Sequence, residues 1–250
     1  AIKYVEENVP DYLYKFYSLS DSDDKLNRKK LDTLRSNSNW FDLVRNQNDP
    51  IDMKMAYIDE TNKKIGQNAI NCAKKMMTDM INYLTICSFA DTSERNLQMW
   101  ANYANKQQGY CVKYKIHNKK AFYKVMYDDN RIPILSIPLN LYKEMDKAAK
   151  GNAEIEALNK YRYYFMLLFN IKHSSWKNEN EYRLFYPVYD HSGLNFSNET
   201  IGIKPVGIYL GLECSDAHKS ELESIAKDNL GCKCYEAFIS DTKILDFKEL

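Results

Sequence analysis

The residues best suited to chemistry lie in one short charged segment, Glu179-Asn180-Glu181-Tyr182-Arg183. In an extended strand, residues two apart face the same side, so the two glutamates and the arginine are expected to share one face. Two neighbouring carboxylates repel each other, which tends to raise the pKa of one, while a nearby arginine keeps the other ionised. Such a group can transfer protons or stabilise a cationic transition state. The alternative is a solvated strand face that carries ordinary cross-strand ion pairs.

A second candidate is the aromatic pair Trp100 and Tyr103. Residues three apart on a helix lie one turn apart and share a face. The two rings can stack on a base or a sugar, or they can fill the core, and core packing is the favoured interpretation. Tyr103 is the better functional candidate of the two, because a buried tyrosine hydroxyl needs a hydrogen-bond partner.

A third candidate is the polar turn Asn48-Asp49-Pro50, followed by Asp52. Proline biases the preceding residue away from helix, and Asn and Asp side chains stabilise turns by bonding to nearby backbone groups. A turn capped by its own side chains explains this segment without any function. The alternative is that Asn48 and Asp49 order a ligand at the rim of a pocket.

Charge and motif content argue against several classes of protein. The net charge of the 250 residues is +1, so no overall field drives binding to nucleic acid or to an anionic membrane. The sequence has no P-loop, no glycine-rich dinucleotide turn and no G-x-S-x-G motif. No apolar run approaches the roughly 18 residues that suggest a membrane span.

The six cysteines permit three disulfides, but reduced thiols in a cytoplasmic protein are the favoured interpretation. The chain is not small, and no secretory segment is evident. Cys232 and Cys234 with His218 or Cys214 form an alternative metal site, which the loose C-x-C spacing disfavours. We therefore expect no metal ion.

Periodicity and turn signals predict a mixture of helices and strands. We expect strands at 12–16, 85–90, 110–116, 122–127, 181–189, 206–210, 232–239 and 243–247, with an extended piece at Trp40-Phe41. We expect helices up to about residue 36, at 59–83, after a capping box at Asp91 and Glu94, within 139–173 with a break at Gly151, and at 215–230. The elements do not alternate strictly, which favours an α+β fold with a mixed, mostly antiparallel sheet and several packed helices. No linker is evident, so residues 1–250 are expected to form one domain.

The order of short motifs resembles that of a large bacterial family of unknown function. The matching segments are Leu13-Tyr14-Lys15-Phe16, Trp40-Phe41, Asn48-Asp49-Pro50-Ile51-Asp52, Cys87-Ser88-Phe89, Met99-Trp100 with Tyr103-Ala104, Gly109-Tyr110-Cys111, Lys172 and Trp176 with Glu179, Glu181, Tyr182 and Arg183, and Ile208-Tyr209-Leu210-Gly211. Two details depart from the family pattern: Ile51 replaces a phenylalanine, and Ser88 and Phe89 are in swapped order. The resemblance extends over nearly the whole chain.

The arrangement is also similar to that of ADP-ribosyltransferase-like folds, which bind NAD. This resemblance implies that Lys15 or Tyr14 lies near the nicotinamide ribose or phosphate and that Tyr103 or Trp100 stacks on the ligand. Glu181 or Glu179 would then stabilise the ribosyl cation. The first strand has no clear histidine or arginine, which departs from the pattern of those folds.

The leading hypothesis is an enzyme that acts on a nucleotide such as NAD, by ADP-ribosyl or glycosyl transfer, in a bacterial toxin or phage-defence setting. Its expected catalytic residues are Glu181, Glu179 and Arg183, and its expected substrate-binding residues are Lys172, Trp176, Trp100, Tyr103, Asn48, Asp49, Tyr14 and Lys15. NAD enters as a substrate, and the sequence indicates no resident cofactor. The alternatives are a non-catalytic binding module for nucleic acid or a protein partner, and a structural subunit with an exposed patch at 161–169. The sequence does not define an oligomeric state.

Overall fold

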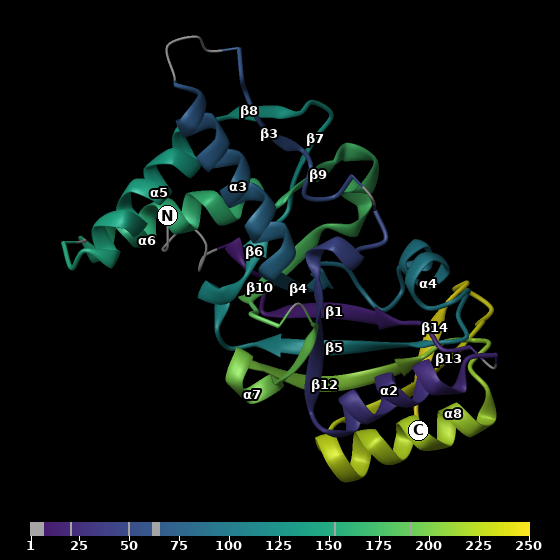
Figure 1. The fold of residues 1–250 in the computed structure, drawn as a ribbon. Helices are drawn as coiled ribbons and strands as arrows, with labels where there is room; N and C mark the ends of the chain where they lie inside the picture. Colours follow the sequence, from purple (N-terminus) through teal and green to yellow (C-terminus); the bar gives the residue numbers. More distant parts are fainter. Residues whose placement is uncertain (1–7, 21, 50, 62–65, 153, 191) are drawn as a thin grey trace.

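The computed structural model describes residues 8–20, 22–49, 51–61, 66–152, 154–190 and 192–250. Its fold is α+β, as expected, and the central feature of the described part is a mixed sheet of ten strands (Figure 1). Eight strands follow the order β11-β2-β4-β1-β5-β12-β13-β14, while β10 pairs with β4 and with β6. All of these pairs are antiparallel except β12 with β13.

The strands of this sheet are β1 (Tyr12–Tyr17), β2 (Ser38–Leu43), β4 (Leu84–Ala90), β5 (Tyr110–Ile116), β6 (Tyr123–Lys124), β10 (Glu181–Pro187), β11 (Leu194–Ser197), β12 (Ile203–Leu210), β13 (Lys233–Phe238) and β14 (Asp246–Glu249). Two short parallel pairs lie outside it: β3 (Ala56–Ile58) with β8 (Ile132–Ile134), and β7 (Met126–Asp128) with β9 (Ile171–His173).

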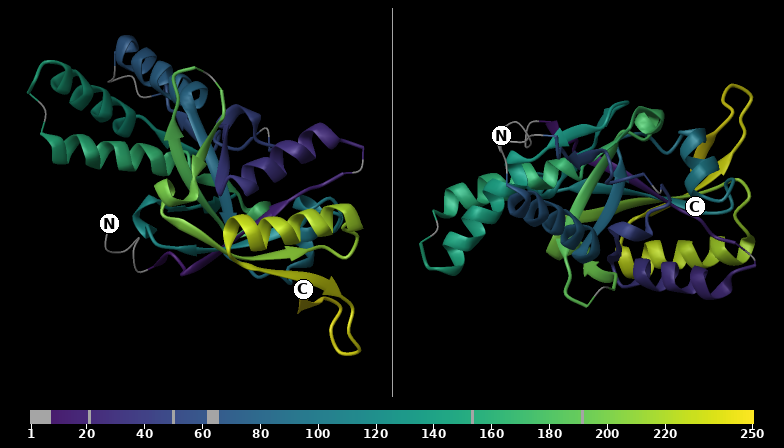
Figure 2. Two further views of the ribbon diagram at one scale, coloured as in Figure 1. Left: turned by 90° about the horizontal axis from the view of Figure 1, so that it is seen from below. Right: turned by 45° about the horizontal axis from the view of Figure 1, so that its top comes forward.

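The helices are α2 (Asp24–Arg35), α3 (Gln67–Tyr83), α4 (Leu97–Tyr103), α5 (Ser136–Ala149), α6 (Ile155–Leu168), α7 (Asn198–Ile201) and α8 (Asp216–Ser224), which continues as the π-helical turn η4 (Ile225–Leu230). Short 3-10 turns are η1 (Val44–Asn46), η2 (Lys119–Ala121) and η3 (Ser174–Glu179). Figure 2 shows α2 and α8 side by side against one face of the sheet, and α5 with α6 as an arm at the opposite end of the molecule.

Alternation along the strands divides the sheet into two faces. Leu13, Val112 and Ile208 pack with residues of α2 and α8, and we call this side the α2/α8 face. Their neighbours, such as Tyr14 and Glu181, lie on the other side, which we call the site face. On the site face, α3, α5 and α6 form a second apolar cluster with β4, and α4 forms a third with β1 and β14.

The starts of two helices differ from the sequence prediction. The helix expected at 59–83 begins only at Gln67, because Asp59 closes a turn by accepting from the amide of Thr61; residues 62–65 lie outside the described part. The helix expected after Asp91 begins at Leu97, where Asn96 accepts hydrogen bonds from the amides of two following residues. The predicted Asp91–Glu94 capping box is therefore wrong.

The expected strand 122–127 is split, because Val125 is buried between β6 and β7, which belong to different sheets. The expected break at Gly151 is confirmed, since this glycine has a φ of +75° between α5 and α6. The region that was predicted as helical up to residue 173 ends instead in the strand β9.

In the described part of the chain, no helix combines the length and apolar character that a membrane crossing needs. The six cysteines are all free thiols. Among the same described residues, no three His, Cys, Asp or Glu side chains gather closely enough to hold a metal ion.

Candidate active site

The charged segment from Glu179 to Arg183 contains a sharp turn of the chain at Asn180. Lys172 lies in β9, Glu179 ends the 3-10 turn η3, and Glu181 begins β10. Between the two glutamates, Asn180 adopts the left-handed conformation with φ of 43°, which asparagine tolerates better than most residues. The amide nitrogen of its side chain donates to the backbone oxygen of Asp91 at 3.0 Å and holds this turn. The prediction that Glu179 lies in the strand is therefore wrong.

Glu181 and Arg183 form the buried centre of the site. Arg183 donates from Nε to Oε1 of Glu181 at 2.7 Å and from a terminal nitrogen to Oε2 at 2.9 Å. The guanidinium also binds both carboxylate oxygens of Asp52, at 3.0 and 2.6 Å. The side chain of Arg183 is only 1% exposed, so these ion pairs are shielded from water. The alternative of a solvated strand face is thus wrong for Glu181 and Arg183.

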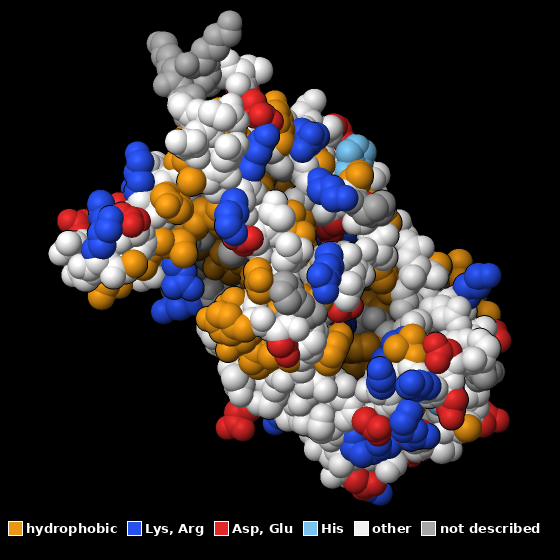
Figure 3. Space-filling view, in the orientation of Figure 1, with side chains coloured by type: hydrophobic (Ala, Val, Ile, Leu, Met, Phe, Trp, Pro, Cys, Tyr) orange, Lys and Arg blue, Asp and Glu red, His pale blue; other side chains and the backbone are white. Residues whose placement is uncertain are grey.

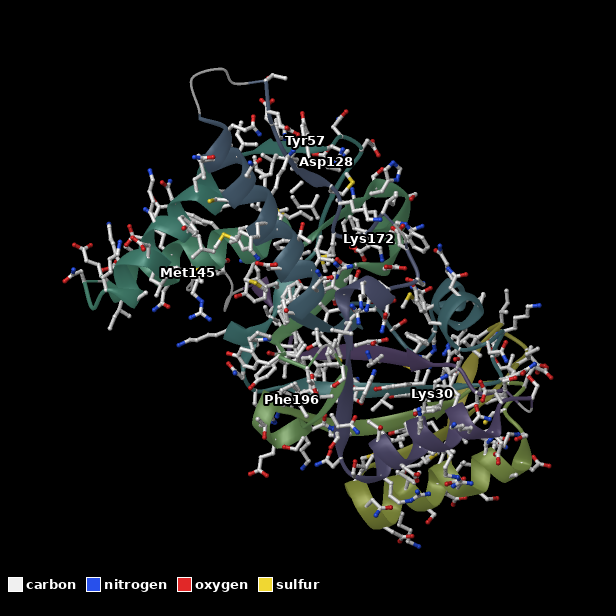
Figure 4. The ribbon with its side chains drawn as sticks, viewed as in Figure 1. Lys30, Tyr57, Asp128, Met145, Lys172 and Phe196 are labelled. Carbon is white, nitrogen blue, oxygen red and sulfur yellow. The ribbon has the colours of Figure 1, made fainter. Side chains whose placement is uncertain are left out.

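Lys172 links this centre to Glu179. Its ammonium lies 2.7 Å from Oε2 of Glu179 and 3.3 Å from Oε2 of Glu181, and 4.7 Å from the ring centroid of Trp176. Tyr103 donates its hydroxyl hydrogen to the other carboxylate oxygen of Glu179. Figure 4 labels Lys172 in the middle of the molecule. We call the chain of contacts Asp52, Arg183, Glu181, Lys172, Glu179 and Tyr103 the buried ion network.

Electrostatics within the network fix the protonation of its centre. Burial raises the pKa of Glu181, but the charges and hydrogen bonds of Arg183 and Lys172 outweigh burial and bring the pKa to about 2. Burial lowers the pKa of Lys172, but Glu181 and Glu179 outweigh this effect and raise it above the usual value. Burial and the hydrogen bond to Glu179 both raise the pKa of Tyr103. Glu181 is therefore an ionised structural anion and not a proton donor.

A small cavity of about 250 Å³ opens next to the network. Its walls come from α4 and η3, through Gln98, Met99, Asn102, Ser175, Trp176, Asn178 and Glu179. Glu179 is the member of the network that lines this cavity, and it supplies the charge among these lining side chains. By formal charge, the network has three carboxylates and two cations, so one negative charge remains uncompensated.

Several residues predicted to bind substrate are placed elsewhere. Trp100 is fully buried, donates to the backbone oxygen of Glu94 at 2.6 Å and packs on Phe16. Its core packing, the interpretation favoured from the sequence, is confirmed. Tyr14 is on the site face but is buried within the same apolar cluster. Lys15 points to the α2/α8 face, where it donates to the backbone oxygen of Ser88 at 2.9 Å.

Part of the polar turn contacts the buried ion network. Asn48 reaches the network, where its hydrogen bond with Tyr103 lowers the pKa of that hydroxyl against the larger effect of burial. Asp49 is buried, and one of its oxygens accepts from the amide of Ile51 at 3.0 Å, as expected for a capped turn; Pro50 lies outside the described part. Asp52 is the residue that sequence reasoning missed as a partner of the charged strand, because 131 positions separate it from Arg183.

The fold and site thus define an α+β protein with a buried chain of alternating charges that ends at a small cavity. Residues 99–184 match the family described as "Protein of unknown function (DUF2971)". This confirms the expected resemblance to a family of unknown function over these residues, while its extension over nearly the whole chain stays a prediction. The matched segment runs from α4 to β10 and contains every member of the buried ion network except Asp52. No curated protein and no solved structure matches the chain.

Proposed function

We propose that the chain is an enzyme that cleaves a glycosidic bond of a nucleotide such as NAD and transfers the ribosyl group to water or to an acceptor. Glu179 is the proposed catalytic carboxylate. The observation that carries this proposal is the position of Glu179, which is one of the residues lining the cavity and whose two carboxylate oxygens contact Lys172 and Tyr103.

The uncompensated charge of the network favours a substrate that becomes cationic. A ribosyl group develops positive charge as the glycosidic bond breaks, and a fixed carboxylate beside it lowers the energy of that state. Lys172 and Tyr103 hold Glu179 in place before the reaction, so little reorganisation is needed at the moment of bond cleavage. Arg183 acts indirectly, because it keeps Glu181 ionised and in contact with Lys172.

The protonation of Glu181 favours a particular leaving group. Cleavage of an ordinary O-glycoside needs a protonated carboxyl to donate to the leaving oxygen, alongside a second carboxylate. A pKa of about 2 removes Glu181 from that role at neutral pH. The pyridinium of NAD is already cationic and departs as neutral nicotinamide without a proton. One carboxylate is sufficient for that reaction, and the cavity has one.

The size and lining of the cavity suit part of a nucleotide. Its volume of about 250 Å³ is below the usual range for whole drug-sized ligands, roughly 300 to 1,000 Å³. We infer that the nicotinamide and the adjoining ribose enter, while the rest of the nucleotide stays outside. Trp176 offers an apolar ring, and the amides of Asn102 and Asn178 offer hydrogen bonds to sugar hydroxyls.

The direct test follows nicotinamide release by liquid chromatography after the purified protein is incubated with NAD, alone and with bacterial cell extract that supplies acceptors. The Glu179→Gln variant is expected to lose about 100-fold or more of the activity, the size typical for removal of one preorganised electrostatic group. Glu156→Gln is the matched control, because Glu156 is an exposed glutamate of α6. It is expected to keep full activity.

Two results would overturn the proposal. One is the absence of nicotinamide release under both conditions. The other is release that is equal in wild type and Glu179→Gln. The toxin or phage-defence setting has its own readout: expression in a bacterial host is expected to slow growth, and Glu179→Gln is expected to relieve this effect while Glu156→Gln does not.

A further inference from the structure

One end of the site face carries lysines and tyrosines in adjoining rows. Tyr12 of β1 pairs with Lys115 of β5, which pairs with Lys204 of β12. In the next row, Lys113 of β5 lies between Tyr14 and Gly207. The register places these positions on one side of the sheet, because a bulge between Pro205 and Gly207 shifts the alternation of β12 by one residue. Tyr12, Lys115 and Lys204 are exposed. We call this area the tyrosine–lysine surface.

The charges of this surface are unbalanced. Lys115 and Lys204 lie directly opposite each other, and like charges in such a pair destabilise a sheet. In the described part of the chain, no carboxylate forms an ion pair with either of them. The nearby Asp11 is already paired with Lys119 at 2.6 Å. The charge of Lys115 also acts on Asp11, but less than that of Lys119 does. An arrangement that costs stability with so little local compensation is typical of a binding surface.

The contact between α2 and α8 contains charged groups that are paired. On α2 and α8, cations of one helix form ion pairs with an acid of the other, such as those of Arg28 and Arg35 with the same Glu221. Figure 3 shows this mixture of blue and red side chains over α2 and α8. Among the described residues, Lys115 and Lys204 have no such ion pair, although the net charge of the whole chain is only +1.

Aromatic rings are interleaved with these lysines. The Lys113 ammonium lies 4.6 Å from the ring centroid of Tyr12, which is 41% exposed. Farther along β12, the rings of Tyr209 and Tyr235 stack with centroids 4.8 Å apart. They flank Gly207, where an added Cβ would lie 3.3 Å from a ring carbon of Tyr209. Because Gly207 has no side chain, the surface between the tyrosine rings and the lysines stays flat.

We propose that the tyrosine–lysine surface binds single-stranded nucleic acid. The lysines contact successive phosphates, and Tyr12 offers a ring on which a base stacks, which is the general pattern of sequence-tolerant single-strand binding. The proposal does not depend on the proposed function, because none of these residues belongs to the buried ion network or lines the cavity. Lysines alone would bind an acidic polypeptide equally well. The aromatic rings favour a nucleic acid, because bases stack on them.

The test is fluorescence anisotropy of a labelled oligothymidylate of about 20 nucleotides, titrated with the intact protein at several salt concentrations. With three phosphate contacts, the logarithm of the association constant should fall against the logarithm of salt with a slope of about −2. The double variant Lys115→Ala, Lys204→Ala is expected to weaken binding about tenfold or more. Its matched control is Lys25→Ala, Lys29→Ala, which removes the same charge from the exposed side of α2.

Two further variants separate the contributions. Tyr12→Leu keeps an apolar side chain without a stacking ring and is expected to weaken binding roughly fivefold or more. Lys115→Glu places an acid opposite Lys204, so it is expected to raise the midpoint of thermal unfolding while it weakens binding. That combination distinguishes a binding surface from a structural one. Glu179→Gln is expected to leave oligonucleotide binding unchanged.

The proposal is overturned if the oligonucleotide does not bind at low salt, or if both double variants weaken binding equally. It is also overturned if polyglutamate of matched charge competes as well as unlabelled oligonucleotide, or if Tyr12→Leu binds like wild type. Either of these results would assign the surface to an acidic polypeptide, since charge alone would then explain the affinity.

Discussion

Glu181 is expected to contribute to the free energy of unfolding by an amount that depends on pH. The pKa of this carboxyl is about 2 in the folded protein, against an ordinary value of 4.5. Each pH unit between these values corresponds to about 1.4 kcal/mol, so ionised Glu181 contributes about 3 kcal/mol to folding. Replacement of Glu181 by glutamine leaves Arg183 and Lys172 without this negative partner. The unfolding free energy of Glu181→Gln should therefore be about 3 kcal/mol below that of wild type at pH 7.

The sign of the pH dependence follows from the lowered pKa. Because the folded pKa lies below the unfolded one, the contribution is fully present above pH 4.5 and is lost as the pH falls toward 2. The difference in unfolding free energy between wild type and Glu181→Gln should therefore be constant from pH 7 down to about 5. Below that it should shrink by about 1.4 kcal/mol for each pH unit.

Urea denaturation followed by tryptophan fluorescence measures this difference at a series of pH values. Glu156→Gln is the control, and its unfolding midpoint should follow that of wild type at every pH. A difference below about 1 kcal/mol at pH 7, which is the size typical for an exposed ion pair, would refute the reasoning. So would a difference that does not change between pH 5 and pH 3.

Three further predictions test the elements around the site. Arg183→Met removes the buried cation that Glu181 and Asp52 share, so a loss of about 3 to 5 kcal/mol in urea denaturation is expected. A stability equal to that of wild type would contradict a buried network. Asn96→Ala should cost about 1 kcal/mol by the same measurement, because the N-cap of α4 is lost. Gly109→Ala should prevent native folding, as judged by near-ultraviolet circular dichroism, since the new Cβ would lie 1.9 Å from the backbone oxygen of Tyr17. Native-like stability of this variant would show that the close approach of the two backbones is not required.

Local patterns were sufficient for much of the fold. The patterns at 110–116 and 85–90 predicted β5 with its exact bounds and β4 to within one residue, because runs rich in apolar and β-branched residues form buried strands. The boundary errors arose where two local signals competed. Asp91 and Glu94 match a capping box, yet Asn96 caps α4 because its side chain reaches two amides of the first turn. Spacing alone does not decide between such caps.

The site was only partly predictable, for a physical reason. The spacing of Glu181 and Arg183 was visible, since both lie on one strand and share a face. The partner of Arg183 was not, because Asp52 reaches it across a sequence gap that no local pattern spans. The sequence did not predict the turn at Asn180 either. Only the left-handed φ of Asn180 in the structure shows that Glu179 lies outside the strand.

The two glutamates look equivalent in sequence, but their surroundings give them different roles. Glu181 binds Arg183 and Lys172 at the buried centre, and its replacement by glutamine leaves both cations short of a charge. Glu179 lies at the end, and after Glu179→Gln the network has two carboxylates and two cations, so it becomes neutral. If the proposed function is correct, Glu179→Gln should lose activity with a small effect on stability, while Glu181→Gln should lose stability first. A variant pair that lost both properties in parallel would show that the network supports the fold alone.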